Sequence, residues 1–202
     1  MLARPQRITK EELIASAQQC IQEKGLDKLT LKAVAEGAGV TQGTVYYHFK
    51  TKEQLMLEIV RSICDASWQT AGSDPQDGSR RDTMVRVLEA ARDRCAEKSY
   101  HTLFFSLVVH SLQNYALRDQ LKGMVERENT HAAGLLARLF PEMEMSGPSL
   151  KYRAMMVNAL IDGLALQALL DPEFEAEAVY AELIGAASAW IEKSSDSSNT
   201  SS

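Results

Sequence analysis

The chain has few cysteines, no long apolar run and no excess of positive charge. The first two shortages exclude classes of protein, and the third limits how DNA could be bound. Three cysteines occur among 202 residues, at Cys20, Cys64 and Cys95, far apart and outside any CxxC motif. They indicate reduced thiols rather than disulfide bonds or a zinc site, and a redox-sensing thiol stays an alternative. No apolar run approaches about 18 residues and no signal-peptide pattern opens the chain, so we expect a cytoplasmic protein without a membrane span.

The net charge is −5, whereas nucleic-acid-binding proteins are usually basic. This charge is distributed unevenly along the chain. Residues 1–56 hold eight Lys or Arg against six Asp or Glu, a net +2, and residues 57–202 hold fourteen against twenty-one, a net −7. A DNA-binding segment is therefore expected at the N-terminal end, where so small an excess neutralises few phosphates per chain.

Apolar residues recur at helical spacing along most of the sequence, which predicts an all-α chain of about nine helices. A capping box of Thr9 and Glu12 opens the first helix, and Asp171 with Pro172 is a start signal for the last. The expected helices are 9–25, a two-turn helix after Thr30, 41–49, 51–71, 80–97, 100–113, 115–140, 149–170 and 172–193.

Composition changes divide the chain into parts. Gly, Pro, Asp and Ser are concentrated in residues 71–82, which we interpret as a linker, and residues 142–149 form another loop. The last nine residues are mostly serine and are predicted to be disordered. We expect an N-terminal domain at 1–56, a helical domain at 57–193 and a disordered tail at 194–202.

Residues 29–57 contain the side chains most suited to a binding function. Gly39 suits a left-handed turn between two short helices, and Thr41 suits the cap of the second. In that second helix Val45 and Phe49 are four residues apart and face inward. The outward positions offer hydroxyl, amide and imidazole groups that can reach phosphates and base edges in a major groove; they are Gln42, Gly43, Thr44, Tyr46, Tyr47 and His48.

A second capping box, of Thr51 and Gln54, opens the helix that follows. The N-terminus of a helix attracts anions, so we expect this end and Lys52 to hold a DNA phosphate together. Arg4 and Arg7 form a short basic arm, for which a frayed terminus and a minor-groove contact are both open interpretations.

This stretch resembles the DNA-binding domain of the TetR family of bacterial repressors. The resemblance rests on the spacing T-x-G-T-x-Y-x-H-F followed by K-x-x-L, and it covers about the first quarter of the chain. The matching residues are Ala35, Gly37, Gly39, Val40, Thr41, Gly43, Thr44, Tyr46, His48, Phe49, Lys52 and Leu55. The implied DNA contacts are Thr30, Thr41, Gln42, Gly43, Thr44, Tyr46, Tyr47, His48 and Lys52.

The resemblance also implies an architecture and a function. It implies a three-helix helix-turn-helix domain followed by a helical domain for ligand binding and dimerisation, without cofactor or metal. The expected function is a homodimeric repressor that a small-molecule inducer releases from a palindromic operator, and an activator would use the same DNA contact. Residues 160–173 resemble the C-terminal domain of the BetI-type branch.

Two apolar stripes in the last two helices suggest how two chains associate. The stripe residues are Met156, Leu160, Gly163, Leu164 and Gln167 in the first helix, and Val179, Leu183, Ala187 and Trp190 in the second. From the pattern alone, burial within one chain explains either stripe as well as a dimer does. The family resemblance implies the dimer.

The most apolar part of the helical domain is residues 100–112, where we expect a ligand pocket. The predicted pocket residues are Leu88, Leu103, Phe104, Leu107, Val108, His110, Met124, Met155 and Asp162. Met and aromatic residues at this spacing are more common in a plain core, and Asp162 suits either a cationic ligand or a structural role. The histidines lack the spacing of metal ligands.

A different class of function remains as an alternative, a helical enzyme or carrier in which the N-terminal hairpin is incidental. No nucleophile–base pair, metal cluster or phosphate loop supports it, because Ser, His and Asp are scattered without a motif. We therefore predict a DNA-binding regulator rather than an enzyme.

Overall fold

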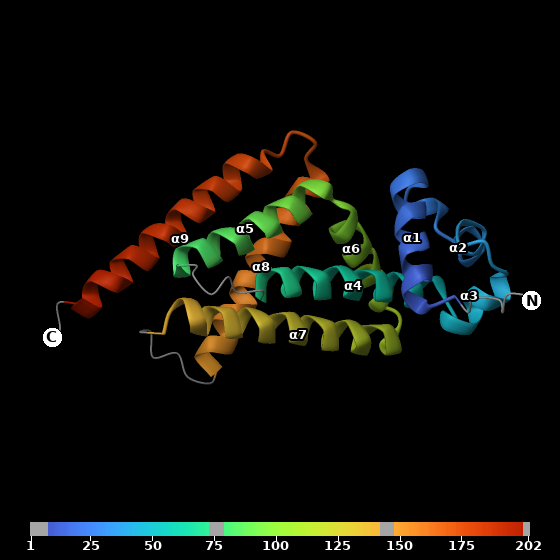
Figure 1. The fold of residues 1–202 in the computed structure, drawn as a ribbon, viewed down its shortest axis with the longest axis horizontal. Helices are drawn as coiled ribbons and strands as arrows, with labels where there is room; N and C mark the ends of the chain where they lie inside the picture. Colours follow the sequence, from blue (N-terminus) through green and yellow to red (C-terminus); the bar gives the residue numbers. More distant parts are fainter. Residues whose placement is uncertain (1–7, 73–78, 142–147, 200–202) are drawn as a thin grey trace, which may run out of the picture. The chain divides into compact units, whose positions relative to one another are not determined.

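The computed structural model describes residues 8–72, 79–141 and 148–199, and over these residues the chain is all-α (Figure 1). The structure confirms the predicted fold class. Its helices are α1 (Lys10–Lys24), the 3₁₀ turn η1 (Leu26–Lys28), α2 (Leu31–Gly37), α3 (Gln42–His48), α4 (Lys52–Gly72), α5 (Arg80–Glu97), α6 (Ser99–Ser111), α7 (Tyr115–Leu139), α8 (Pro148–Leu170) and α9 (Ala176–Asn199). The basic arm with Arg4 and Arg7, and most of the two predicted loops, lie outside the described residues.

The helices form two compact units. Unit 1 is Met1–Ile63 with Leu103–Leu121, and unit 2 is Cys64–Thr102 with Lys122–Ser202. The division falls inside α4 rather than after residue 56, and part of α6 and α7 belongs to unit 1. A long helix keeps its hydrogen-bond ladder across a packing boundary, so α4, α6 and α7 each contribute to both units.

Unit 1 begins with the predicted capping box. The amide of Glu12 donates to the Thr9 hydroxyl at 3.1 Å, and the amide of Thr9 donates to the Glu12 carboxylate at 2.7 Å. The apolar face of α1, with Leu13 and Ala17 fully buried, packs against the short helices that follow. The first helix is therefore a structural support for the helix-turn-helix, as its pattern predicts.

A close approach of α1 and α2 depends on Gly37. A Cβ atom at this position would lie 2.7 Å from Ser16 Oγ, which itself donates to the carbonyl of Val34 at 3.1 Å. A side chain at Gly37 must push that hydroxyl aside and break its hydrogen bond.

We therefore expect Gly37→Ala to leave the free energy of unfolding nearly unchanged, because the lost hydrogen bond of about 1 kcal/mol offsets the helix-propensity gain of about 0.5–1 kcal/mol from alanine. Urea denaturation measures the effect. Gly123→Ala on α7, where a Cβ meets nothing within 4 Å, is the control and should stabilise the protein by about 0.5–1 kcal/mol. If Gly37→Ala proves as stabilising as the control, the close approach is not a constraint.

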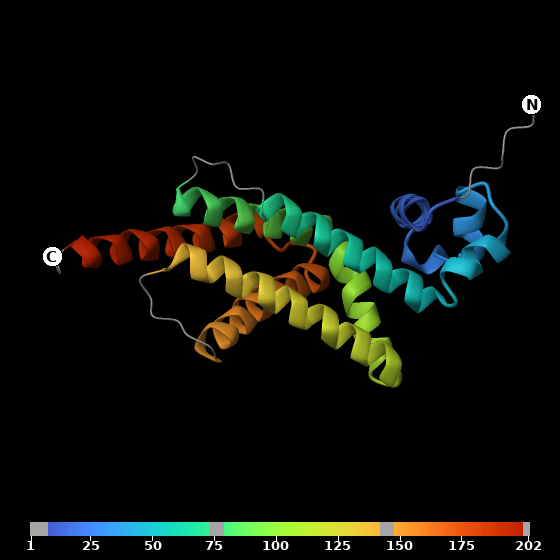
Figure 2. The same ribbon diagram turned by 60° about the horizontal axis from the view of Figure 1, so that its bottom comes forward.

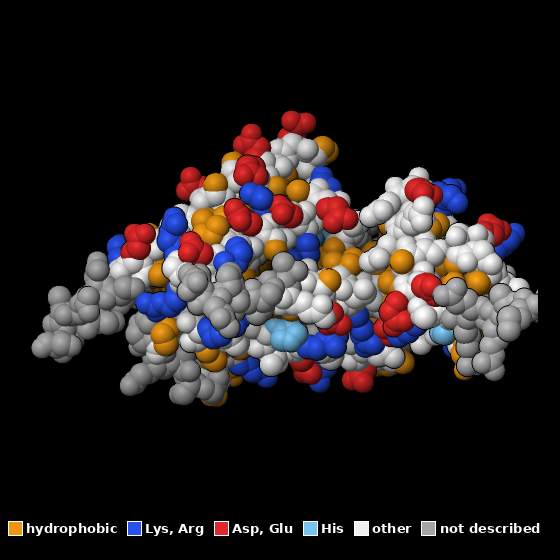
Figure 3. Space-filling view, viewed as in Figure 1, with side chains coloured by type: hydrophobic (Ala, Val, Ile, Leu, Met, Phe, Trp, Pro, Cys, Tyr) orange, Lys and Arg blue, Asp and Glu red, His pale blue; other side chains and the backbone are white. Residues whose placement is uncertain are grey.

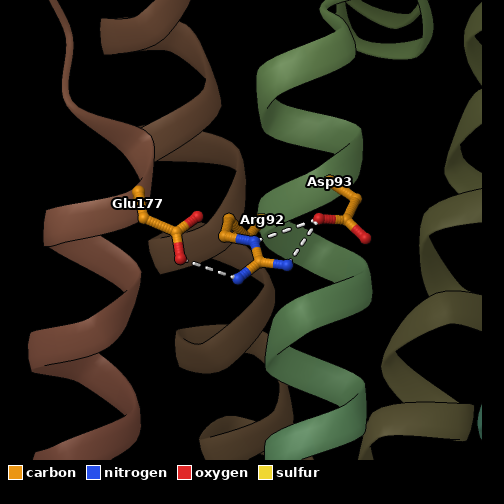
Figure 4. Close-up of polar contacts among 3 residues, drawn as sticks. All are labelled: Arg92, Asp93 and Glu177. Atoms are coloured by element: carbon orange, nitrogen blue, oxygen red, sulfur yellow. Dashed lines mark hydrogen bonds and ion pairs between the residues drawn. The ribbon is translucent and has the colours of Figure 1, made fainter.

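Unit 2 holds two apolar clusters, one at each end of the α5–α9 pair. Met84, Leu135, Leu139, Phe140 and Ile191 form the first, with Trp68, Leu88 and Ala187 packed against it. Ala91, Cys95, Ala165, Ala168 and Tyr180 form the second, with Leu164 and Leu183 packed against it. On the surface, Arg92 of α5 bonds Glu177 of α9 at 3.1 Å and Asp93 at 2.9 Å (Figure 4). The clusters hold the pair together, since exposed ion pairs contribute little.

The predicted start of the last helix was wrong. Asp171 and Pro172 were expected to cap and open it, but α9 begins at Ala176. The Asp171 carboxylate accepts from the amide of Glu173 at 2.9 Å, and the amide of Phe174 donates to the carbonyl of Asp171 at 3.3 Å. These bonds close a turn between α8 and α9, an alternative use of Asp that competes with helix capping.

The end of α9 also differs from the expectation. The helix continues to Asn199, six residues past the predicted end at 193 and into the segment expected to be disordered. Helix propagation adds one hydrogen bond per residue once a packed helix exists, so serines that disfavour starting a helix do not by themselves end one. Residues 200–202 lie outside the described part of the chain.

Candidate nucleic-acid interface and effector region

The turn between α2 and α3 has the geometry that the sequence predicts. Gly39 has φ +67°, in the left-handed region, and the amide of Val40 donates to the carbonyl of Ala35 at 2.9 Å. This is the hydrogen bond that closes a helix with glycine after its last turn. Thr41 then caps α3 by accepting from the amide of Thr44 at 3.2 Å, so the turn sets the direction of α3.

Helix α3 presents one polar face to solvent because its other face is anchored. Val45 and Phe49 are fully buried, as predicted, whereas Tyr47 is 70% exposed and Tyr46 is also exposed. The other predicted contact residues divide into exposed ones (Thr30, Thr41, Gln42 and Gly43) and half-buried ones (Thr44, His48 and Lys52). The predicted DNA-contact set is thus brought together around one short helix, apart from Thr30, which caps α2.

Lys50 belongs to this surface, and the sequence analysis missed it. Its ammonium lies 4.9 Å from the ring centroid of Tyr46 and 5.8 Å from that of Tyr47, and it donates to the carbonyl of Tyr47 at 3.5 Å. The signal was available, since Lys50 follows the two tyrosines at three- and four-residue spacing. The result is an exposed cation held over two aromatic rings beside α3.

Lys52 is placed differently from the expectation that it holds a phosphate with the start of α4. Its ammonium donates to the carbonyl of Leu26 at 3.3 Å and is half-buried. The start of α4 is capped as well, because the amide of Gln54 donates to the Thr51 hydroxyl and the amide of Lys50 donates to the Gln54 side chain. Lys52 therefore supports η1 in this structure.

The predicted pocket residues fall into both units. In unit 1, Leu103, Phe104 and Leu107 are buried and Val108 is half-buried, whereas His110 is exposed and bonds the carbonyl of Ser106 at 2.7 Å through Nδ1. In unit 2, Met124 is buried, Met155 is exposed and Leu88 packs against the first apolar cluster. Leu88 and Met124 thus have the character of core residues, the more common role for such side chains.

Asp162 is the member of this set with unusual electrostatics. Its Oδ1 atom lies 4.0 Å from Nε2 of the buried His101. The pKa of Asp162 is raised to about 6, mainly by burial and further by the Glu128 carboxylate, while Arg94 opposes the rise. Burial lowers the pKa of His101 to about 4, with Arg94 adding to the effect. Both groups therefore favour their neutral forms inside unit 2.

These two shifts predict opposite dependences of stability on pH. The raised pKa of Asp162 stabilises the folded state fully when the pH is below 3.8, the usual pKa of an aspartate. This stabilisation is lost as the pH rises through about 6, where the carboxyl group ionises in the folded protein. His101 has the opposite dependence. Its neutral imidazole stabilises the folded state when the pH is above 6.5, the usual pKa of a histidine, and this stabilisation is lost as the pH falls toward about 4.

We expect Asp162→Asn to remove the pH dependence of stability that comes from Asp162 and to leave only that from His101. The variant should be more stable than the parent at pH 7, and this gain should disappear by about pH 4. Urea unfolding between pH 4 and pH 7.5 measures both curves. A gain that does not change with pH would show that Asp162 titrates normally.

A groove lies between α4 and α7 within unit 2, where Figures 1 and 2 both show the two helices running side by side. Its volume is about 590 Å³. The lining residues are Asp65, Trp68, Gln69, Thr130, His131, Gly134, Leu135 and Arg138. None of the predicted pocket residues lines this groove.

The two predicted dimer stripes are partly buried within the chain. Leu164, Leu183 and Ala187 pack against the clusters of unit 2, and Gly163 and Val179 are half-buried. The remaining members are exposed: Met156 (71%), Leu160 (47%), Trp190 (45%) and Gln167. Only 17% of the most apolar stretch of α8 is buried within the chain. By length and composition alone, this helix is also long and apolar enough to cross a membrane.

Comparisons with known proteins agree with this arrangement. Residues 13–59 match the model of the bacterial regulatory proteins of the tetR family, and residues 80–188 match the C-terminal model of BetI-type transcriptional repressors. The tetracycline repressor protein class D of Escherichia coli is 30% identical over 156 residues, which cover 65% of this chain and 72% of that protein. The regulator TtgR of Pseudomonas putida is 25% identical over 203 residues, covering 93% and 90%.

A solved structure gives the same result for the fold. A TetR-family transcriptional regulator from Rhodococcus sp. superposes with a TM-score of 0.70 at 26% identity, over 88% of this chain and 95% of that one. Regulators of this family bind DNA and small-molecule effectors, so both are partners of this chain, and they are not enzymes. The chain therefore belongs to the TetR family of bacterial DNA-binding transcriptional regulators.

Proposed function

We propose that the protein is a repressor that binds a palindromic operator as a homodimer and leaves it when a small-molecule effector binds. The surface around α3 carries this proposal. Thr41, Gln42 and Tyr47 present polar groups to solvent on a helix that Val45 and Phe49 anchor, and Lys50 adds a cation beside it. Such a helix supplies both phosphate and base-edge contacts.

The uncovered side of α8 and α9 supports the homodimer. Met156, Leu160 and Trp190 expose apolar surface in a single chain, which a second copy of the same surface would cover. An apolar helix that is mostly uncovered in one chain fits this interface, and we propose a cytoplasmic dimer. With a net charge of only +2 in residues 1–56, two copies at a fixed spacing are needed for tight binding.

Release by an effector requires a connection between the two units, and α4 supplies one. Lys52 at its start bonds η1 in unit 1, whereas Asp65 and Trp68 near its end line the groove in unit 2. An effector that shifts the end of α4 biases the separation of two recognition helices in a dimer, and operator DNA accepts only one separation. The names of several relatives, the tetracycline repressor among them, support repression rather than activation.

Selection of bound sequences from random double-stranded DNA tests this proposal. The purified protein should enrich a palindromic motif whose retention weakens steeply as salt rises. A promoter carrying that motif should be less active when the protein is present. No enrichment, or an asymmetric motif, would contradict the homodimeric operator complex, and increased transcription would indicate an activator.

A further inference from the structure

We infer that the groove between α4 and α7 of unit 2 is a binding site for an aromatic cation, held by the face of Trp68 and the carboxylate of Asp65. Binding itself is independent of the proposed function. The further statement that this cation is the effector rests on the proposed function.

The size of the groove suits a small organic molecule. Its volume of about 590 Å³ lies within the roughly 300–1,000 Å³ of drug-sized ligand sites. Leu135 supplies an apolar wall, and Thr130 and Gln69 supply polar groups, so the lining is mixed as in most such sites.

Trp68 is oriented and polarised by an acidic partner. Its indole N–H donates to Oε2 of Glu128, and its ring lies 5.1 Å from that of His131 at 54°. An anionic acceptor on the N–H increases the electron density of the indole, which strengthens its attraction for a cation placed on its face. The second oxygen, Oε1 of Glu128, is buried and has no hydrogen-bond partner among the described residues.

The charges around Trp68 favour a cation over an anion. Asp65 lies three residues before Trp68 on α4, lines the groove and has no ion pair within the described part of the chain. Glu128 adds a second carboxylate at the N–H edge of the ring. Arg138, the cation of the lining, follows His131 by seven residues, about 10 Å along α7. The Trp68 end of the groove is thus negatively charged.

The aromatic lining favours a flat ligand. Trp68 and His131 both line the groove, and their ring centroids lie 5.1 Å apart. Aromatic rings pair favourably with a further flat ring in offset or edge-to-face arrangements. This favours an aromatic cation over a simple alkylammonium ion.

Three quinoline probes of different charge test the site on the full chain without DNA at pH 7.5. They are N-methylquinolinium, neutral quinoline and anionic quinoline-4-carboxylate, with binding measured by titration calorimetry and by quenching of tryptophan fluorescence. We expect the cation to bind at least about fivefold more tightly than either other probe. This ratio corresponds to about 1 kcal/mol of attraction between the positive charge and the groove. Equal or tighter binding of the carboxylate would overturn the inference.

Two variants assign the binding to this groove. Asp65→Asn should weaken the cation about fivefold and leave neutral quinoline unchanged, whereas Asp119→Asn, the same change at an exposed position in unit 1, should alter neither. Trp68→Phe, which keeps an aromatic ring in the core contact, should remove most of the quenching while Trp190 still reports the fold. Unchanged cation binding in Asp65→Asn would place the cation elsewhere and refute the site.

The regulatory statement has its own readout. N-methylquinolinium should release operator DNA from the parent protein at concentrations that leave Asp65→Asn bound. Binding without release would refute the effector role and leave the cation site standing. Absence of operator binding in the first place would refute the proposed function, and the calorimetric result would be unaffected.

Discussion

Replacing Leu160 with Glu is expected to give a monomer that has lost operator affinity by at least about 100-fold. Leu160 is exposed in one chain and lies on the uncovered face of α8. In a dimer this face is buried, and a buried carboxylate without a partner costs several kcal/mol, each 1.4 kcal/mol being a factor of ten. Sedimentation velocity gives the oligomeric state, and a gel shift gives the operator affinity.

Leu112→Glu is the matched control for this variant. Leu112 is 68% exposed, directly follows α6 in unit 1 and undergoes the same chemical change in a segment outside α8 and α9. It should remain a dimer with unchanged operator affinity. A dimeric Leu160→Glu protein would contradict the proposed interface, and a monomer that still binds its operator tightly would contradict the need for two recognition helices.

Tyr47→Ala and Lys50→Ala are each expected to weaken operator binding by about tenfold or more, with the fold and the dimer intact. Both side chains are exposed, so their removal leaves no cavity in the core. The two variants should differ in how DNA binding depends on salt and on DNA sequence. Loss of a phosphate contact by Lys50→Ala weakens all DNA sequences alike and lowers the salt slope by about one, whereas loss of a base contact relaxes specificity.

Lys122→Ala provides the control for the charge change. Lys122 is an exposed lysine on α7 in unit 2, paired with Glu126 at 3.7 Å. It should leave the operator affinity and the salt slope unchanged. If Lys50→Ala behaves like Lys122→Ala, Lys50 does not touch the DNA backbone.

Local signals in the sequence were sufficient for the helix-turn-helix. The capping box at Thr9, the left-handed Gly39 and the buried pair Val45 and Phe49 depend on residues within a few positions of one another. Short-range geometry determines them, so a pattern finds them. Lys50 was within reach of the same reasoning, since its partners are three and four residues away.

Features set by contacts between distant residues were not predictable in this way. Lys52 bonds the carbonyl of Leu26, 26 positions earlier, and no local pattern contains that contact. The Trp68–Glu128 bond joins α4 to α7, and the groove beside it arises only from their packing. None of the predicted pocket residues lines this groove, because helical periodicity marks apolar faces without showing which of them leave space.

In the last two helices, the sequence misplaced a helix start and did not separate buried from exposed stripe residues. Asp171 and Pro172 form a valid start signal, but the carboxylate closes a turn, and α9 starts at Ala176. The stripe residues Leu164 and Leu183 proved to be packed within the chain, whereas Met156 and Leu160 are exposed. A stripe in the sequence identifies an apolar face, and only the fold separates the part that one chain buries from the part left for a partner.

Hydroxyl-radical footprinting on the selected DNA motif tests the central claim most directly. A homodimer that places one α3 in each of two successive major grooves should protect two backbone segments related by two-fold symmetry, about one helical turn apart. Both segments should lose protection together in Tyr47→Ala. A single protected segment, or protection that is unchanged in Tyr47→Ala, would contradict the account.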